Sequence, residues 1–186
     1  MTTQYLSCAE TAKLIRAALK KAFPVCKFIV KSKTYSGGAS INVDWIDGPT
    51  DKMVSAVTGQ FTGGNFDGSI DMAYSNSSWL LPDGSACVAS CPGTSGSMGS
   101  RSPTENAKPV AGAKLVRFGA DFVFTNRSMS PTFAERVLAK TVAKYGNVEL
   151  QVGVSTYDGT AYLEGDYDAQ RWAREIAGRF MTLRAA

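Results

Sequence analysis

The sequence predicts an α+β fold with two pseudo-repeated helix–β-hairpin–helix units, a central β-rich segment and a long Gly/Ser loop. Three observations predict it. Helical apolar spacing follows N-capping residues at two places, an alternating hairpin with a glycine turn follows each helix, and the two patterns are offset by 122 positions. With 186 residues, 44% of them hydrophobic, the chain is long enough for a sizeable core, so we expect a single domain over 1–186.

The first unit is expected over 7–61. Ser7 and Glu10 have the spacing of a capping box, and Pro24 ends the helix that follows. A strand then alternates up to Thr34, and the turn at 34–39 contains glycines that permit a positive φ, which is typical of a β-hairpin. The return strand is expected at Ser40–Trp45 and the closing helix at Thr50–Phe61.

The second unit is expected over 129–184. Ser130 is a potential N-cap followed by proline at the first helical position, and Gly146 ends the helix. A strand from Leu150, the turn at 156–161 and a return strand at Tyr162–Tyr167 repeat the hairpin, and a helix at Ala169–Leu183 closes the unit. The internal pseudo-repeat 7–61 and 129–184 therefore flanks a central segment, 62–128.

The central segment reads as short strands and turns. Residues 114–127 alternate as a strand, or as two strands split at Gly119. Residues 90–112 are rich in Gly, Ser, Pro and Thr, so we expect a long loop that is functional or mobile. Five aromatic residues are assigned to the core, and the last three of them have even spacing that suits one strand face: Trp45, Trp79, Phe118, Phe122 and Phe124.

Composition argues against most catalytic classes. The chain has no histidine, which removes Ser-His-Asp and Cys-His nucleophile systems, His-ligated metals and the usual general base near neutral pH. We therefore expect a protein that is not an enzyme and has no cofactor. The net charge of +4, from 20 Lys+Arg and 16 Asp+Glu, is compatible with nucleic acid but does not by itself indicate it.

The N-terminal residues and the cysteines indicate the compartment. Residues 1–7 have neither a basic stretch nor an apolar stretch of a secretory signal, so we expect a cytoplasmic protein. The four cysteines are then expected to be free thiols, mostly buried: Cys8, Cys26, Cys87 and Cys91. A zinc site would need all four because no histidine is available, and we favour free thiols.

Basic residues concentrate near the N-terminus, where residues 1–33 carry seven Lys or Arg and one acid. Three of them recur on one helix face, and three more alternate with an aromatic residue along the next strand, which suits phosphate contacts. A solvated polar face is the simpler alternative. The candidate nucleic-acid or partner-binding residues, including one arginine of the Gly/Ser loop, are Lys13, Arg16, Lys20, Lys27, Lys31, Lys33, Tyr35 and Arg101.

Two other patterns carry weaker hypotheses. Asp67 and Asp71 could bind Mg²⁺ or act as a general acid/base pair, but Asp before Gly is a common turn sequence and explains most of the acidic residues of this segment. The glycine-rich residues 92–100 lack the G-K-[ST] ending of a phosphate-binding loop, and we favour a flexible linker.

Several motifs in one order carry a resemblance to a known family. They are Tyr35-Ser-Gly-Gly-Ala-Ser-Ile41, Trp45-Ile-Asp-Gly-Pro49, Phe61-Thr-Gly-Gly-Asn-Phe-Asp-Gly68, Trp79-Leu-Leu-Pro-Asp-Gly84 and Phe118-Gly-Ala-Asp-Phe-Val-Phe124. From the first helix to about Tyr162, the chain resembles the large polyvalent protein-associated domains of phages and conjugative plasmids. The resemblance implies a protein that travels with invading DNA and protects or establishes it; it implies no catalytic residues. The matching glycines, Asp-Gly turns and aromatics suggest a conformational signature.

The leading hypothesis is thus a non-enzymatic accessory protein of a mobile genetic element, a phage or a plasmid. It would act in counter-defence or establishment by binding a host defence protein or a nucleoprotein complex. The alternative is direct nucleic-acid binding through the basic strand and helix face, and a second alternative is a metal-dependent enzyme on the Asp cluster. No membrane partner is expected, and the sequence leaves the oligomeric state open.

Overall fold

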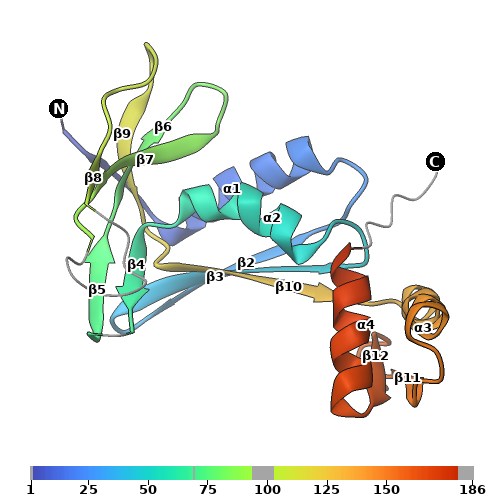
Figure 1. Ribbon diagram of the computed structural model, residues 1–186. Helices are drawn as coiled ribbons and strands as arrows, with labels where there is room; N and C mark the ends of the chain where they lie inside the picture. The colour runs from blue at the N-terminus through green and yellow to red at the C-terminus, as the bar shows by residue number, and fades with distance from the viewer. Residues whose placement is uncertain (1, 69, 94–102, 180–186) are drawn as a thin grey trace. The chain divides into compact units, whose positions relative to one another are not determined.

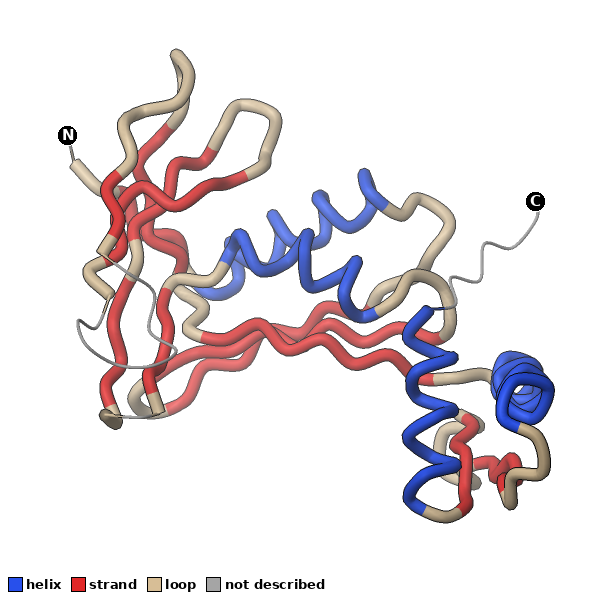
Figure 2. Tube along the Cα trace, in the orientation of Figure 1, coloured by secondary structure: helices blue, strands red, loops and turns tan. Residues whose placement is uncertain are grey.

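The computed structural model describes residues 2–68, 70–93 and 103–179 (Figure 1). The chain forms two compact units. Unit 1 comprises Met1–Pro24, Phe28–Val43 and Ser55–Phe124, and unit 2 comprises Val25–Lys27, Asp44–Val54 and Thr125–Ala186. The fold is mixed α+β, as the sequence predicts, and the strands β4 to β10 follow one another between the helical segments α2 and α3 (Figure 2). The prediction of one domain over 1–186 stays a prediction.

The elements from β1 to β10 form three sheets. A five-stranded sheet in unit 1 has the order β1-β9-β6-β7-β8, in which β1 runs parallel to β9 and the other pairs that this sheet contains are antiparallel. A separate antiparallel pair is β4-β5, and a three-stranded sheet has the order β10-β3-β2. The bounds are β1 Gln4–Leu6, α1 Cys8–Ala22, β2 Ile29–Tyr35, β3 Gly38–Ile46, α2 Asp51–Thr58, the 3-10 helix Gly59–Phe61, β4 Gly64–Asp67, β5 Met72–Ser75, β6 Ser77–Leu80, β7 Ala86–Cys91, β8 Thr104–Glu105, β9 Lys114–Phe118 and β10 Phe122–Ser128.

Helix α1 starts where the sequence predicts. The Ser7 side chain accepts from the backbone N–H of Glu10, while the Glu10 carboxylate accepts from the backbone N–H of Ser7, so the capping box is complete. The buried residues of α1 are Cys8, Thr11, Ala12, Ile15 and Leu19, which follow the helical period. This apolar stripe is turned toward the rest of unit 1, and α1 packs on β2 (Figure 1).

Close backbone contacts hold the connection between β9 and β10 in unit 1. The Gly63 N–H donates to the carbonyl of Ala120, 2.8 Å away, and a Cβ on residue 63 would overlap the carbonyl oxygen of Phe118. A Cβ on Gly119 would lie 2.6 Å from the carbonyl oxygen of Leu6. Glycines at these two positions let three backbone segments approach one another. Gly63 belongs to the motif Phe61–Gly68 and Gly119 to the motif Phe118–Phe124, so these two motifs of the sequence meet at this connection.

The predicted core is partly confirmed. Trp45, Trp79 and Phe118 are buried, and Phe118 packs edge-on against Phe61 with ring centroids 5.5 Å apart. The assignment of Phe122 and Phe124 to the core is wrong: they are 40% and 50% exposed. Successive side chains of a strand point to opposite faces, and both phenylalanines point to the face of β10 that no described helix covers in unit 1.

The long loop at 90–112 is shorter than predicted. Thr104 and Glu105 form strand β8, which pairs with Cys91 and Ser90 at the end of β7. The Trp79 indole N–H reinforces this pairing by donating to the carbonyl of Asn106 at 3.0 Å. The tertiary contact therefore recruits part of a Gly/Ser-rich segment into a sheet, and residues 94–102 lie outside the described residues.

The second half of the chain forms a helix, a hairpin and a helix in unit 2: α3 Pro131–Tyr145, β11 Leu150–Val154, β12 Ala161–Gly165 and α4 Tyr167–Arg179. Phe133 and Val137 of α3 pack with Ala173 and Ile176 of α4 in one buried cluster. Tyr145 and Trp172 extend it, with stacked rings 4.7 Å apart. The order helix, strand, strand, helix occurs in both halves of the chain, but the structural equivalence of the two segments stays a prediction.

Asp47 and Arg127 organise the other part of unit 2. Asp47 has a φ of 56° and Gly48 a φ of 64°, so two successive left-handed residues form the turn. The Asp47 carboxylate accepts from the backbone N–H and the hydroxyl of Ser130 at 2.8 and 2.7 Å, and Ser130 is the N-cap of α3. The turn thereby fixes the start of α3. The sequence predicts the turn and the cap separately but not their contact.

Arg127 holds the same turn through its guanidinium group. It donates to the carbonyls of Asp47, Gly48 and Ala177 at 2.8–3.0 Å and lies over the Phe133 ring, 4.7 Å from its centroid. Burial lowers the pKa of Arg127, and the nearby Asp47 carboxylate opposes this shift. No helix in the described part of the chain is long and apolar enough to span a membrane.

Replacing Gly63 with alanine is expected to destabilise the protein by about 3 kcal/mol, because the new methyl group would overlap backbone that cannot move independently. The measurement is urea unfolding followed by tryptophan fluorescence. Gly59→Ala is the matched control, since a Cβ there meets no atom within 4 Å and alanine favours the helical conformation. Equal stability of the two variants would contradict the packing described for Gly63.

Replacing Arg127 with methionine is expected to cost about 3 kcal/mol, because three carbonyl groups lose a charged donor while much of the side-chain volume stays. The same urea titration measures the loss. Arg136→Met is the control, because Arg136 is an exposed residue of α3. If both substitutions change the unfolding free energy equally, Arg127 does not organise the turn.

Candidate nucleic-acid interface

The hairpin β2–β3 sets the register of the three-stranded sheet. A two-residue turn, Ser36–Gly37, joins the strands, and Gly37 has a φ of 88° that suits glycine. Tyr35 therefore lies opposite Gly38, and a Cβ on Gly38 would lie 3.0 Å from the Tyr35 ring. In the same antiparallel register, Lys33 lies opposite Ser40 and Lys31 lies opposite Asn42.

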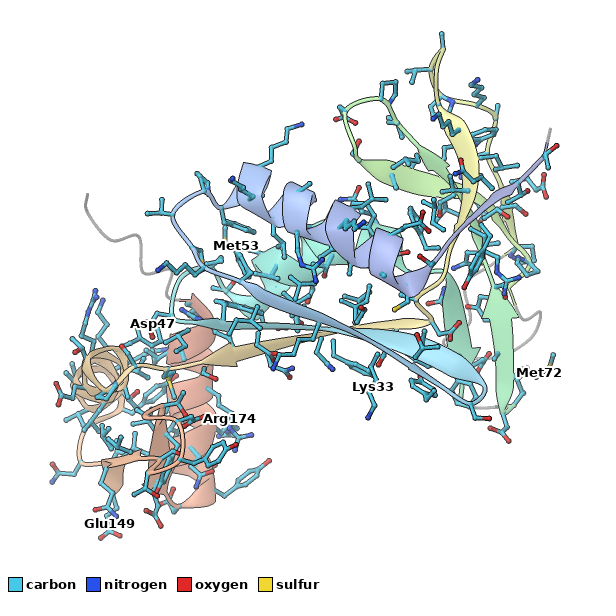
Figure 3. The ribbon with its side chains drawn as sticks, turned by 180° about the vertical axis from the view of Figure 1, so that it is seen from behind. Lys33, Asp47, Met53, Met72, Glu149 and Arg174 are labelled. Atoms are coloured by element: carbon cyan, nitrogen blue, oxygen red, sulfur yellow. The ribbon has the colours of Figure 1, made fainter. Side chains whose placement is uncertain are left out.

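One face of this sheet carries the core and the other is open. Ala39, Ile41 and Val43 of β3 are buried and share one face, so Ser40 and Asn42 point to the other, where Ser40 is also buried and Asn42 is half-buried. On β2, Val30 is the one buried residue, and Lys31 and Lys33 are exposed and point to the face opposite to Val30. Figure 3 shows Lys33 projecting from the side of the sheet opposite α1. Lys31, Lys33 and Tyr35 thus belong to the face that α1 does not cover.

Strand β10 adds two phenylalanines to the open face. The Asp121 N–H donates to the Ala39 carbonyl, and the Asp47 N–H donates to the Ser128 carbonyl, both at 2.9 Å, so β10 and β3 run in the same direction. The Asn126 amide donates to the Asp44 carboxylate at 3.0 Å, which places the even-numbered residues of both strands on one face. Phe122 and Phe124 alternate with Asn126 along β10 and are 40% and 50% exposed, so they point to the face of Asn42.

We call Lys31, Lys33, Tyr35, Phe122 and Phe124 the aromatic–lysine face; all five lie in unit 1. The two phenylalanine rings stack with centroids 6.0 Å apart and an interplanar angle of 19°, and Tyr35 is 44% exposed. Because neighbouring strands lie about 5 Å apart, each lysine backbone is about 10 Å from the phenylalanine row. Exposed rings beside cations on a flat sheet can stack bases and bind phosphates.

A purely structural role can explain why lysines lie on this face, but it explains only the lysines. Strand β2 is an edge of its sheet, and lysines on edge strands discourage pairing with another chain. It does not account for Phe122 and Phe124, since an exposed apolar pair increases the tendency of a surface to associate. The phenylalanine pair is thus the feature of this face that indicates binding.

The predicted basic surface is divided in the structure. Lys13, Arg16 and Lys20 are exposed on α1, on the other side of the sheet from Lys33. The Arg16 guanidinium donates to the carbonyl of Val30 at 2.6 Å, so it fastens α1 to the edge of β2. Lys27 belongs to unit 2, and Arg101 lies outside the described residues.

The sequence predicts Phe122 and Phe124 in the core because large aromatic residues are usually buried. The signal that pointed to a shared face was their even spacing, which by itself does not tell an exposed face from a buried one. The exposed fractions of the two rings, 40% and 50%, decide it, and Asn126 on the same face of β10 is exposed as well.

The other candidate sites are not assembled in the described part of the chain. Within it, no group of three or more Cys, Asp or Glu side chains could hold a metal ion. Asp67 is buried and Asp71 is exposed at a turn with a φ of 54°. The glycine-rich residues 92–100 lie largely outside the described residues.

The cysteines are free thiols, but fewer are buried than predicted: Cys8 and Cys91 are buried, Cys26 is half-buried and Cys87 is exposed. Burial raises the pKa of the Cys8 thiol and also that of the Cys26 thiol. Both groups therefore stay protonated at neutral pH, which disfavours nucleophilic or metal-binding roles for them.

The comparison with protein families places the motifs in context. The model for large polyvalent protein associated domain 29 matches residues 6–130. The chain belongs to this family. The resemblance in the sequence is thereby confirmed at the level of the polyvalent protein associated domains. No curated protein and no solved structure has significant similarity to the chain.

The matched region of this polyvalent protein associated domain contains the whole aromatic–lysine face and ends at Ser130, the N-cap of α3. Helix α3, the β11–β12 hairpin and helix α4 follow beyond it. Glycines and an Asp-Gly turn within the matched region position backbone: Gly63 and Gly119 permit close approach, and Asp47 fixes the N-cap of α3. The expected conformational signature thus has a structural basis at these positions.

Proposed function

We propose that this domain binds single-stranded nucleic acid through the aromatic–lysine face, as an accessory protein of a mobile genetic element. Membership of a polyvalent protein associated domain family supports the link with phage or plasmid DNA. The stacked, exposed Phe122–Phe124 pair beside Lys31 and Lys33 is the observation that supports the binding mode. Of the alternatives that the sequence leaves open, this geometry favours direct nucleic-acid binding.

Single strands fit this face better than a duplex. A flat sheet presents its rings to unstacked bases, whereas the bases of a duplex are stacked on one another and turn only their edges outward. Phe122 and Phe124 alternate on one strand, and such neighbouring rings suit successive bases. Base stacking tolerates any sequence, because every base has an aromatic face, so we expect weak sequence preference.

The local charge also suits an anion. Lys31 and Lys33 are both exposed on the same side of β2. The Asp121 carboxylate lies beside the hairpin, 2.8 Å from where a Cβ on Gly38 would be, and it accepts a hydrogen bond from the Ala39 N–H at 2.9 Å. Phosphates can then lie along β2 while bases lie over β10, about two strand spacings away.

The proposed role is binding without catalysis or a cofactor. The chain has no histidine, and the protonated thiols of Cys8 and Cys26 are poor nucleophiles. A role in counter-defence or establishment would follow from occupying single strands that form when DNA enters a new cell. A host nucleoprotein complex as partner agrees with the same surface, because its nucleic acid would be the group recognised.

Fluorescence-anisotropy titration against labelled single-stranded DNA and RNA, and against the matching duplexes, tests the proposal at two salt concentrations. We expect single strands to bind more tightly than duplexes, with affinity that falls steeply as salt rises. Lys31→Glu combined with Lys33→Glu is expected to abolish binding. Phe122→Ala and Phe124→Ala are each expected to weaken it by about 5- to 100-fold, the usual contribution of one stacked base.

Two matched controls sharpen the test. Lys13→Glu with Lys20→Glu makes the same change of charge on α1, on the other side of the sheet, and Phe66→Ala removes a phenylalanine that is 52% exposed on β4. Both are expected to bind within about twofold of the unchanged protein, since neither alters the face. Equal losses in the two lysine pairs, or equal affinity for duplex and single strand, would contradict the proposal.

A further inference from the structure

In the β11–β12 hairpin of unit 2, the outer edge of β11 pairs with no described strand, whereas the outer edge of β12 has an isolated bridge between Ala161 and Met129. Its register pairs Leu150 with Gly165 and Val154 with Ala161. The next pair in this register is Ser155 and Thr160, and the Ser155 N–H donates to the Thr160 carbonyl at 2.8 Å. The Ala161 N–H points away from β11 and donates to the Met129 carbonyl at 2.7 Å. The alternation of an antiparallel pair then turns the peptide groups of Val152 and Val154 outward from β11.

This edge lacks the usual protection. Edge strands in natural proteins commonly carry lysine or proline, or a bulge, which discourage pairing with another chain. Strand β11, Leu-Gln-Val-Gly-Val, contains no charged residue and no proline, and its register with β12 has no shift. Helices α3 and α4 pack against the hairpin through Leu150 and Leu163, and the outer edge of β11 has no paired strand within the described residues.

The solvent-facing side of the hairpin is acidic and bears tyrosine. The register brings Glu149 beside Asp166 and Gln151 opposite Glu164, and the Tyr162 ring covers Gly153. Glu149, Glu164 and Asp166 line a shallow hollow of about 520 Å³, and Figure 3 shows Glu149 at the end of the hairpin. Residues 145–170 contain five acidic residues and no lysine or arginine, although the chain as a whole has a net charge of +4.

We propose that the free edge of β11 accepts an extended, basic segment of a partner protein as a third strand. Main-chain hydrogen bonds to the outward peptide groups of Val152 and Val154 would supply the pairing. Every second side chain of the added strand would point to the solvent-facing side, where lysines or arginines meet Glu149 and Glu164. Tyr162 is 50% exposed and Tyr157 is 97% exposed. Their rings offer the contact area that tyrosine commonly provides at interfaces.

Charge identifies the occupant. Nucleic acid is repelled by this acidic surface, so the hairpin is separate from the aromatic–lysine face both in charge and in chemistry. It also follows the region that the family shares, which ends at residue 130. The inference does not depend on nucleic-acid binding, and either can fail without the other.

Anisotropy of a fluorescein-labelled peptide of eight alternating lysine and valine residues tests the inference with the full-length chain. We expect saturable binding at low salt, at least about tenfold weaker binding of the matching glutamate–valine peptide, and a similar loss when alternate backbone nitrogens of the lysine peptide are methylated. Methylation removes hydrogen-bond donors but keeps charge, so it separates strand addition from simple attraction.

Glu164→Lys is expected to weaken peptide binding about tenfold, whereas Glu135→Lys, the same change at an exposed position of α3, is expected to leave it within about twofold. Circular dichroism confirms that both variants fold. Equal binding of the methylated peptide, or equal losses in the two variants, overturns the inference. Sedimentation without peptide is a further test: a dimer abolished by Val154→Pro would show that a second copy occupies the edge, and would also overturn it.

Discussion

The connection between β9 and β10 is the constraint on which unit 1 depends. There the backbone of Phe118 to Asp121 lies against two other chain segments, at distances that only glycine allows at positions 63 and 119. Asp121 then pairs with Ala39 through its main chain and its side chain, which joins β10 to the β2–β3 hairpin. Phe122 and Phe124 follow immediately, so their position on the open face is set by this packing rather than by their own hydrophobicity.

The two surfaces described here differ in kind. The aromatic–lysine face lies within the region that the family shares and combines stacked rings with cations, which suits an anionic partner with flat groups. The β11–β12 hairpin lies beyond that region and combines unpaired main chain with carboxylates, which suits a basic polypeptide. Within unit 2, Asp47 holds the start of α3 through Ser130, and Arg127 donates to the Ala177 carbonyl of α4.

Local features were predicted most accurately from the sequence. The Ser7–Glu10 capping box and the Ser130 N-cap depend on residues within three positions of one another, and the structure confirms both. The site was predicted less well. Lysines of α1 and β2 were grouped because they are close in sequence, but a sheet separates the two sets, and Lys33 points away from α1. The exposed phenylalanines were assigned to the core because spacing does not say which face meets solvent.

By itself, the sequence determined the mixed α+β class, the helix caps, the Asp-Gly turns and the family, because each depends on short-range chemistry or on the order of short motifs along the chain. Only the tertiary structure decided which strand faces are covered, that Thr104 and Glu105 pair with β7, and that Arg127 binds carbonyls from three separate residues. Those outcomes require partners about 15 to 80 positions away. Which distant partner satisfies a polar or apolar group is settled by the packing of the whole unit, and no local pattern encodes it.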